Sequence, residues 1–140
     1  MDLIAVEPVF NLYNLEWPIY SWQPPLPPAK FVFDEDGRRG QAVDSLVCAG
    51  VILSGGTVRR SVLSSDVITR ERSLVEDSVL MDGVDVGAGA VVRRAIVDKN
   101  VSIPPGVQIG VDRERDSRRF TLSRRGRVVI GKGQAVWPDE

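Results

Sequence analysis

Charged side chains are the main candidates for ligand binding in this chain. Histidine is absent from the 140 residues, and Cys48 is the single cysteine. A histidine general base and a zinc site of histidines or clustered cysteines are therefore both excluded. Two of the adjacent arginine pairs, at 59–60 and 93–94, resemble an anion site in the linear sequence. How these pairs are positioned decides whether they bind anything.

A seventeen-residue repeat provides that positioning. From Ser61 the chain reads SVLSSDVITRERSLVED, then SVLMDGVDVGAGAVVRR, then AIVDKNVSIPPGVQIGV; a looser copy one residue shorter, SLVCAGVILSGGTVRR, begins at Ser45. A short constant period indicates supersecondary units that bury their apolar faces only by stacking on neighbours. An ordinary β-sandwich of short strands is the alternative, but a sandwich has no reason to repeat at a constant seventeen.

Within each copy, a small or β-branched residue is followed two positions later by a larger residue, usually aliphatic, and this triplet occurs three times. Residues i and i+2 of a strand share a face, so each triplet points two side chains inward. The larger inward residues are Leu63, Thr69, Val75, Leu80, Val86, Val92, Val97, Ile103 and Ile109. The smaller ones are Ser61, Val67, Ser73, Ser78, Val84, Ala90, Ala95, Val101 and Val107.

Three triplets per copy predict three short strands around a triangular coil, with coils stacked as parallel strands ~4.8 Å apart. Glycines lie between triplets, where corners require positive φ: Gly55, Gly56, Gly83, Gly89 and Gly106. This is the hexapeptide pattern, and it predicts an all-β, parallel β-helix of about four coils over residues 45–111. The left hand of the helix is taken from what hexapeptide-repeat proteins look like.

Stacking also brings outward residues of successive copies together. Arg59–Arg60, Glu76–Asp77 and Arg93–Arg94 form a column of alternating sign, which predicts a structural ladder rather than an anion site.

The motif SGGTVRR at 54–60 has adjacent glycines but lacks the strand–loop–helix context of a phosphate cradle, so it is interpreted as a corner. A second column is aliphatic, and it predicts contact with another surface: Leu46, Val62, Val79 and Ile96.

The segments that flank the coils are not repetitive. Residues 1–30 predict a connector with short helical turns followed by a proline-rich, extended stretch. Residues 31–33 predict a strand, with a turn at 34–37. After a charged stretch, TLSRRGRVVIG predicts a hairpin that turns near 123–126 and caps the open end of the stack. The predicted organisation is thus a connector (1–30) and a β-helix domain (31–140) whose cap spans 112–140.

Composition limits the partners and the compartment. The net charge of −1 gives no bulk attraction to nucleic acid or membrane. No apolar run approaches the ~20 residues of a membrane span, and no secretory signal is visible. Cys48 lacks a disulfide partner within the chain and is predicted to be a small core or near-core residue, which suits a reducing cytoplasm.

The runs NLEWPIYSW, PPLPPAKFVFD, SLVCAGVILSGG, VDKNVSIPPGVQIG and DSRRFTLS resemble, in order, the C-terminal domain of bacterial glucose-1-phosphate adenylyltransferase. The resemblance covers essentially the whole chain. It implies an enzyme that forms ADP-glucose and pyrophosphate from ATP and glucose 1-phosphate, with Mg²⁺, for glycogen biosynthesis. The catalytic centre of that family lies in a separate N-terminal domain with a Gly-rich loop, which is missing here, so this chain alone is expected to be inactive and to need no cofactor.

In that family the β-helix domain contributes to a homotetramer and to allosteric control by phosphorylated metabolites. The resemblance implies that Lys99, in VDKNV, and Lys132, in VVIGKG, bind such effectors together with the catalytic domain. For Lys99 the alternative is a salt bridge with Asp82, one coil below. Arg118 and Arg119 are weaker candidates, because pairing with Glu114 or Asp116 within the cap explains them equally well.

A second hypothesis is a stand-alone scaffold protein whose coils trimerise. The aliphatic column distinguishes the two hypotheses. Contact of Val62, Val79 and Ile96 with residues 1–22 or with a further domain favours the enzyme part, and contact around a threefold axis favours the scaffold.

Overall fold

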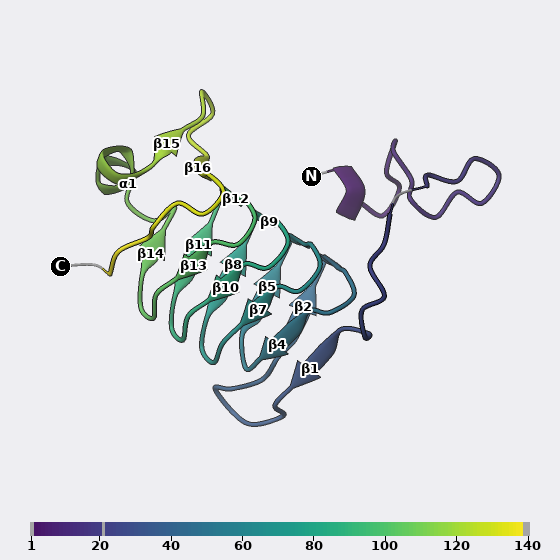
Figure 1. Ribbon diagram of the computed structural model, residues 1–140, viewed down its shortest axis with the longest axis horizontal. Coiled ribbons are helices and arrows are strands. Elements are labelled where there is room, and N and C mark those ends of the chain that lie inside the picture. The colour runs from purple at the N-terminus through teal and green to yellow at the C-terminus, as the bar shows by residue number, and fades with distance from the viewer. Residues whose placement is uncertain (1, 21, 139–140) are drawn as a thin grey trace.

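The computed structural model describes residues 2–20 and 22–138, and its main feature is a stack of β-coils (Figure 1). Each coil is built from short strands, because every triplet supplies only two or three extended residues before the chain turns. The strands are β1 (Lys30–Val32), β2 (Gln41–Val43), β3 (Leu46–Val47), β4 (Ile52–Ser54), β5 (Thr57–Arg59), β6 (Val62–Leu63), β7 (Ile68–Thr69), β8 (Leu74–Glu76), β9 (Val79–Leu80), β10 (Asp85–Val86), β11 (Val91–Arg93), β12 (Ala95–Val97), β13 (Ser102–Ile103), β14 (Gln108–Ile109), β15 (Thr121–Leu122) and β16 (Val128–Ile130).

The strands form three sheets, ordered β1-β4-β7-β10-β13, β14-β11-β8-β5-β2 and β15-β16-β12-β9-β6-β3. From β1 to β14, each strand pairs in parallel with the strand three places further along the chain. Leu63 lies opposite Leu80, one repeat later, so one repeat is one turn. The result is a hexapeptide-repeat β-helix of about four turns, which confirms the predicted fold class.

The core lies inside the coils. All of the predicted inward residues are buried, and most of them are fully inaccessible to solvent. Thr69 is the unusual member, because it occupies a position that Leu80 and Val75 fill elsewhere, and its hydroxyl has no hydrogen-bond partner among the described residues. Small residues such as Ala90 and Ser78 fit where the walls of the coil converge.

The corners use left-handed backbone conformations, as predicted for four of the five glycines. The φ angles of Gly55, Gly83, Gly89 and Gly106 lie between +67° and +77°. The prediction is wrong for Gly56, which is absent from the positive-φ positions of the described residues. A Cβ on Gly56 would lie 2.5 Å from Ser73 Oγ and 2.7 Å from Thr69 Oγ1, so close packing is what requires glycine there.

The parallel sheets extend beyond residues 45–111 at both ends. The strand expected at 31–33 is β1, which pairs with β4, and β2 pairs with β5. At the other end, β15 and β16 form the expected antiparallel hairpin, and β16 also continues the coil by pairing in parallel with β12. The charged stretch before the hairpin is a helix, α1 (Arg113–Arg119), for which no apolar periodicity gave a signal. Asp112 caps it by accepting from the amides of Glu114 and Arg115.

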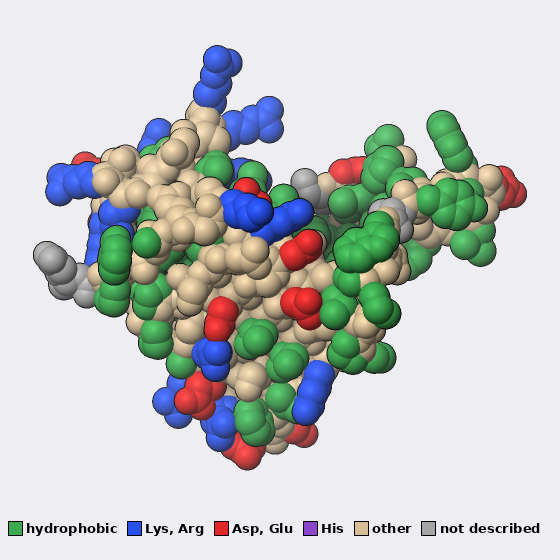
Figure 2. Space-filling model, viewed as in Figure 1, with side chains coloured by type: hydrophobic (Ala, Val, Ile, Leu, Met, Phe, Trp, Pro, Cys, Tyr) green, Lys and Arg blue, Asp and Glu red, His purple; other side chains and the backbone are tan. Residues whose placement is uncertain are grey.

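The N-terminal segment lies off the stack, at the upper right of Figure 1. It contains one short 3₁₀ helix, η1 (Asp2–Ile4), followed by turns. The proline-rich stretch then joins the first coil, where Gly50 N donates to Pro27 O at 2.7 Å and Lys30 N to Val51 O at 2.8 Å. Figure 2 shows hydrophobic side chains gathered over the projecting segment, and the exposed ones include Val6, Val9, Tyr13, Leu15, Trp17 and Tyr20.

Candidate functional site

Lys99 and Lys132 lie at one corner of the stack, on consecutive coils. Val97 pairs with Ile130 in the β12–β16 register. The register continues past the strands, because Asp98 N donates to Ile130 O at 2.9 Å and Gly133 N donates to Lys99 O at 3.3 Å. Both lysines are exposed. The structure therefore brings together the two residues that the resemblance singled out.

The salt bridge proposed as the alternative for Lys99 is present but weak. Lys99 Nζ lies 4.0 Å from Asp82 Oδ2, and each side chain is about half exposed, at 52% and 51%. A water-exposed pair at this distance contributes little and leaves the ammonium group able to bind another anion. Lys132 forms no ion pair with any carboxylate in the described part of the chain.

Arg118 and Arg119 belong to the cap, on helix α1. The Nη2 of Arg119 donates to the carbonyl of Trp137 at 2.5 Å, and its guanidinium lies 5.0 Å from the centre of the Phe120 ring. These contacts fasten the C-terminal residues to the cap. Arg118 is exposed. The charge of Arg119 also acts on the buried carboxyl group of Asp116, whose pKa it lowers against the larger, raising effect of burial.

The arginine column is a structural ladder, as predicted. Arg60 contacts Glu76 at 2.7 Å and Asp77 at 2.8 Å, and Arg93 contacts Glu76 at 3.2 Å from the coil on the other side. The hydrogen bond from the guanidinium of Arg60 lowers the pKa of Asp77. The carboxylates of the middle coil thus pair with Arg60 on one side and with Arg93 on the other.

The aliphatic column is continuous in the register. Leu46 pairs with Val62, Val62 with Val79, and Val79 with Ile96, and all four side chains are half-buried. Val129 of β16 continues the column, opposite Ile96. Sequence analysis missed Val129 because helix α1 and the hairpin interrupt the period before it.

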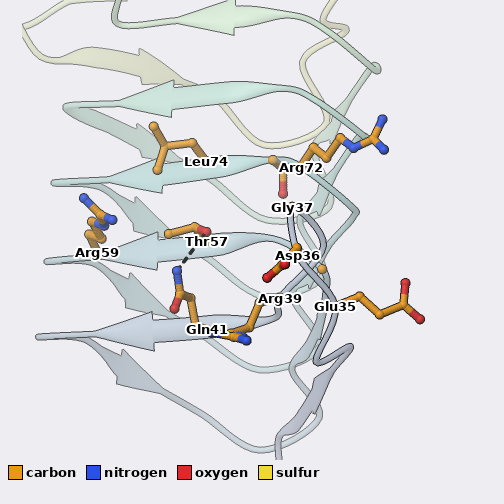
Figure 3. A pocket seen from close by; sticks show the side chains of 11 residues that line it. Glu35, Asp36, Gly37, Arg39, Gln41, Thr57, Arg59, Arg72 and Leu74 are labelled. Carbon is orange, nitrogen blue, oxygen red and sulfur yellow. Dashed lines mark hydrogen bonds between the residues drawn. The ribbon is translucent and has the colours of Figure 1, made fainter.

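A hollow on the outside of the coils was not predicted from the sequence (Figure 3). Its volume is about 450 Å³, and it lies between the β1–β2 loop and the outer face of β2, β5 and β8. Gln41 Nε2 donates to Thr57 Oγ1 at 3.4 Å on its floor. Figure 3 shows Arg59 and Arg72 at opposite sides of this hollow, with Asp36 between them. The lining is thus a mixture of both charges rather than a cluster of one sign.

Cys48 does not occupy the core or near-core position predicted for it. It follows inward-facing Val47 and is exposed at a corner, where it lines a pocket of about 330 Å³ with Trp22, Ser65 and Asp82. Partial burial, assisted by the negative charge of Asp82, raises the pKa of the thiol. A raised pKa keeps the sulfur protonated at neutral pH and makes it a poor nucleophile.

Across the described residues, no three cysteine or acidic side chains converge in a way that holds a metal ion. Nor do residues 2–20 and 22–138 include a helix with the length and apolarity to cross a membrane.

The stacked parallel coils, their buried triplets and the glycine corners define the hexapeptide-repeat β-helix class. The family described as "GlmU-like, C-terminal hexapeptide" matches residues 27–130, and the chain belongs to it. Among curated proteins, the chain is 58% identical to the glucose-1-phosphate adenylyltransferase of Frankia casuarinae, over 97% of this chain and 33% of that protein. It is 57% identical to the enzyme of the same name from Arthrobacter sp. strain FB24, over 100% of this chain and 30% of that protein.

A third relative of that name, from Nitrosospira multiformis, is 52% identical over 93% of this chain and 31% of its own length. The predicted resemblance to glucose-1-phosphate adenylyltransferases is confirmed. The chain spans about a third of the length of the curated relatives that it matches.

Proposed function

We propose that this chain is the regulatory and subunit-contact part of a glucose-1-phosphate adenylyltransferase. The whole enzyme forms ADP-glucose and pyrophosphate from ATP and glucose 1-phosphate in glycogen biosynthesis, in the cytoplasm. Relatives of that name match nearly the whole of this chain, which supports the proposal. They are about three times as long, which leaves room in each for a separate catalytic domain.

The observation that carries the regulatory role is the stacking of Lys99 and Lys132 at one corner. Parallel strands in neighbouring coils are ~4.8 Å apart, so the two lysines present two positive charges to one phosphate group. This shared position suits a phosphorylated metabolite, because both ammonium groups can donate hydrogen bonds to the oxygen atoms of one negatively charged phosphate group. The remaining cations of this effector site are supplied by the catalytic domain of the parent enzyme.

The aliphatic column and the N-terminal segment provide the surfaces that contact the rest of the enzyme. The half-buried column from Leu46 to Val129 presents one apolar strip on the third sheet. The projecting residues 2–20 expose several aromatic and aliphatic side chains, including Trp17 and Tyr20. Exposed apolar surfaces of this kind bury themselves against protein. We assign them to the catalytic domain and to neighbouring subunits of a homotetramer.

This chain alone is proposed to have no catalytic activity. The only adjacent glycines, Gly55 and Gly56, lie at the corner between β4 and β5, where Gly56 packs against Thr69 and Ser73. Their amides do not open a helix, so they lack the geometry of a loop that cradles a nucleotide triphosphate. Mg²⁺ and ATP would then be bound by the other domain.

A chimera tests the proposal. This chain replaces the matching third of the Frankia casuarinae enzyme, and ADP-glucose synthesis is measured for the chimera and for this chain alone. The proposal predicts synthesis by the chimera, none by the chain alone, and a response of the chimera to phosphorylated metabolites. ADP-glucose synthesis by the chain alone, or an active chimera that fails to respond to any phosphorylated metabolite, contradicts it.

A further inference from the structure

The C-terminal cap carries a charge excess that the proposed function does not use. Within the cap, residues 112–130 contain seven arginines and three acidic residues, a net charge of +4 in a chain whose net charge is −1. Figure 2 shows basic side chains standing out at the tip of the β15–β16 hairpin, at the top of the view. Such a concentration of one charge attracts anions.

A small cavity lies beneath this surface, where the last coil meets the cap. Three arginines line it, and each comes from a different element: Arg94 from the corner before β12, Arg113 from helix α1, and Arg125 from the hairpin turn. The volume is about 100 Å³. A water molecule takes about 30 Å³ in the liquid and drug-sized ligands need ~300 Å³ or more, so the cavity suits a small ion.

The balance of charge around the cavity is positive. Asp116 is the single carboxylate in the lining; it is 2% exposed, and its Oδ2 accepts from Gly110 N at 2.9 Å. Arg94 donates from Nη2 to Gly110 O at 3.0 Å, and its other N–H groups have no hydrogen-bond partner among the described residues. Arg113 and Arg125 form no ion pair with any carboxylate of the described chain.

Several arginines on the coil faces are paired with carboxylates. Arg60, Arg70 and Arg93 each contact a carboxylate of a neighbouring coil at 2.7–3.2 Å. The three arginines that line the cavity beneath the cap have no such ion pair among the described residues. The larger hollow of Figure 3 does not share this property, because Glu35 and Asp36 also line it and Arg39 is paired with Asp34.

We propose that the cavity between the last coil and the cap binds inorganic phosphate or a similar tetrahedral oxyanion through Arg94, Arg113 and Arg125. The guanidinium group matches such an anion with paired N–H donors, and the charge of the anion offsets three cations that otherwise repel one another. A bound anion joins the coil, the helix and the hairpin, and so stabilises the cap on the stack. The site is separate from the Lys99–Lys132 corner, because Arg94 and Lys99 flank opposite ends of β12.

The test is a titration of the 140-residue chain with inorganic phosphate at constant ionic strength, followed by the NMR signals of the arginine side chains. Arg113→Gln and Arg125→Gln should each weaken phosphate binding about tenfold, the usual effect of losing one charge-assisted hydrogen bond. Arg124→Gln is the matched control on the same hairpin tip, because Arg124 does not line the cavity. It should change the affinity by less than about twofold.

A gain-of-affinity variant guards against loss of binding through misfolding. Asp116→Asn keeps an oxygen for the amide of Gly110 and removes the one negative charge in the lining, so it should tighten phosphate binding. Lys99→Gln and Lys132→Gln should leave binding at the cap intact. The proposal is overturned if Arg124→Gln weakens binding as much as Arg125→Gln, if Lys99→Gln abolishes every phosphate-dependent shift, or if no saturable binding occurs up to roughly 10 mM phosphate.

Discussion

Lys99 and Lys132 occupy the same position on consecutive coils, joined through the hydrogen bond of 3.3 Å from Gly133 N to Lys99 O. Helix α1 and a hairpin strand lie between them in the chain, yet β16 returns to pair with β12 and restores the register. One coil below, Asp82 lies 4.0 Å from the ammonium group of Lys99. The corner therefore combines two exposed cations with the exposed carboxylate of Asp82, while the carboxylate of Asp98 accepts from the backbone amide of Lys99 at 2.7 Å.

Asp82→Asn is expected to strengthen the binding of phosphorylated effectors to this corner. The carboxylate competes with an incoming anion for Lys99, and the exposed pair contributes little to folding, so stability should hardly change. Isothermal titration of the chimera with fructose 1,6-bisphosphate measures the effect. Asp36→Asn, an exposed carboxylate on the β1–β2 loop, is the control. Equal tightening by both variants would show only a general change of net charge.

The contribution of the Arg60–Asp77 contact to stability should depend on pH. Hydrogen bonding by Arg60 lowers the pKa of Asp77, so the native state favours the charged carboxylate. The stabilisation is complete above the unfolded pKa of about 3.9 and is lost as the pH falls through the lower folded value. Chemical denaturation of the wild type and of Arg60→Gln should therefore differ at pH 7 and converge at strongly acidic pH. Arg59→Gln is the neighbouring control, and a gap that persists at acidic pH contradicts the account.

Thr69→Val should stabilise the coil stack. The hydroxyl of Thr69 is fully buried and has no partner in the described structure, and valine fills nearly the same volume without a polar group to desolvate. The expected gain in the free energy of unfolding is about 1 kcal/mol. Thr57→Val is the control, because Thr57 faces outward and its hydroxyl accepts from Gln41. A lower denaturation midpoint for Thr69→Val would mean that the hydroxyl has a partner after all.

Gly110→Ala should be far more damaging than Gly106→Ala. Both glycines have positive φ, +77° and +73°, so each substitution incurs the strain of a left-handed alanine, roughly 1–2 kcal/mol. A Cβ at Gly110 would also collide with the carbonyl of Arg93, whereas a Cβ at Gly106 meets nothing within 4 Å. Thermal melts should place the Gly110→Ala midpoint well below that of Gly106→Ala. Equal midpoints would refute the predicted backbone contact.

The coil interior was predictable because one period determines it. Each inward position repeats the same local pattern, so the burial of Leu63, Val86 and Ile109 follows from counting alone. The corners were less predictable, because glycine serves two purposes there. Gly55 adopts positive φ, whereas Gly56 makes room for Ser73 and Thr69, and sequence spacing does not separate a backbone requirement from a packing requirement.

The sites were harder to predict because they depend on contacts between distant elements. The resemblance indicated Lys99 and Lys132, but their stacking depends on β16 rejoining the sheet after the period has ended. The cavity beneath the cap needs the helix, the hairpin and the last coil together. Helix α1 itself has no apolar stripe to reveal it, since Asp116 is its single buried residue.

The most direct test of the central claim is the affinity of the chimera for phosphorylated effectors when each of its three lysines from this chain is replaced. Lys99→Ala and Lys132→Ala should each weaken the binding of fructose 1,6-bisphosphate or AMP, whichever binds the parent chimera, by about tenfold. Lys30→Ala, on the exposed face of β1, should leave that affinity unchanged. Equal effector binding by all three variants and the parent would contradict the assignment of this corner as the regulatory site.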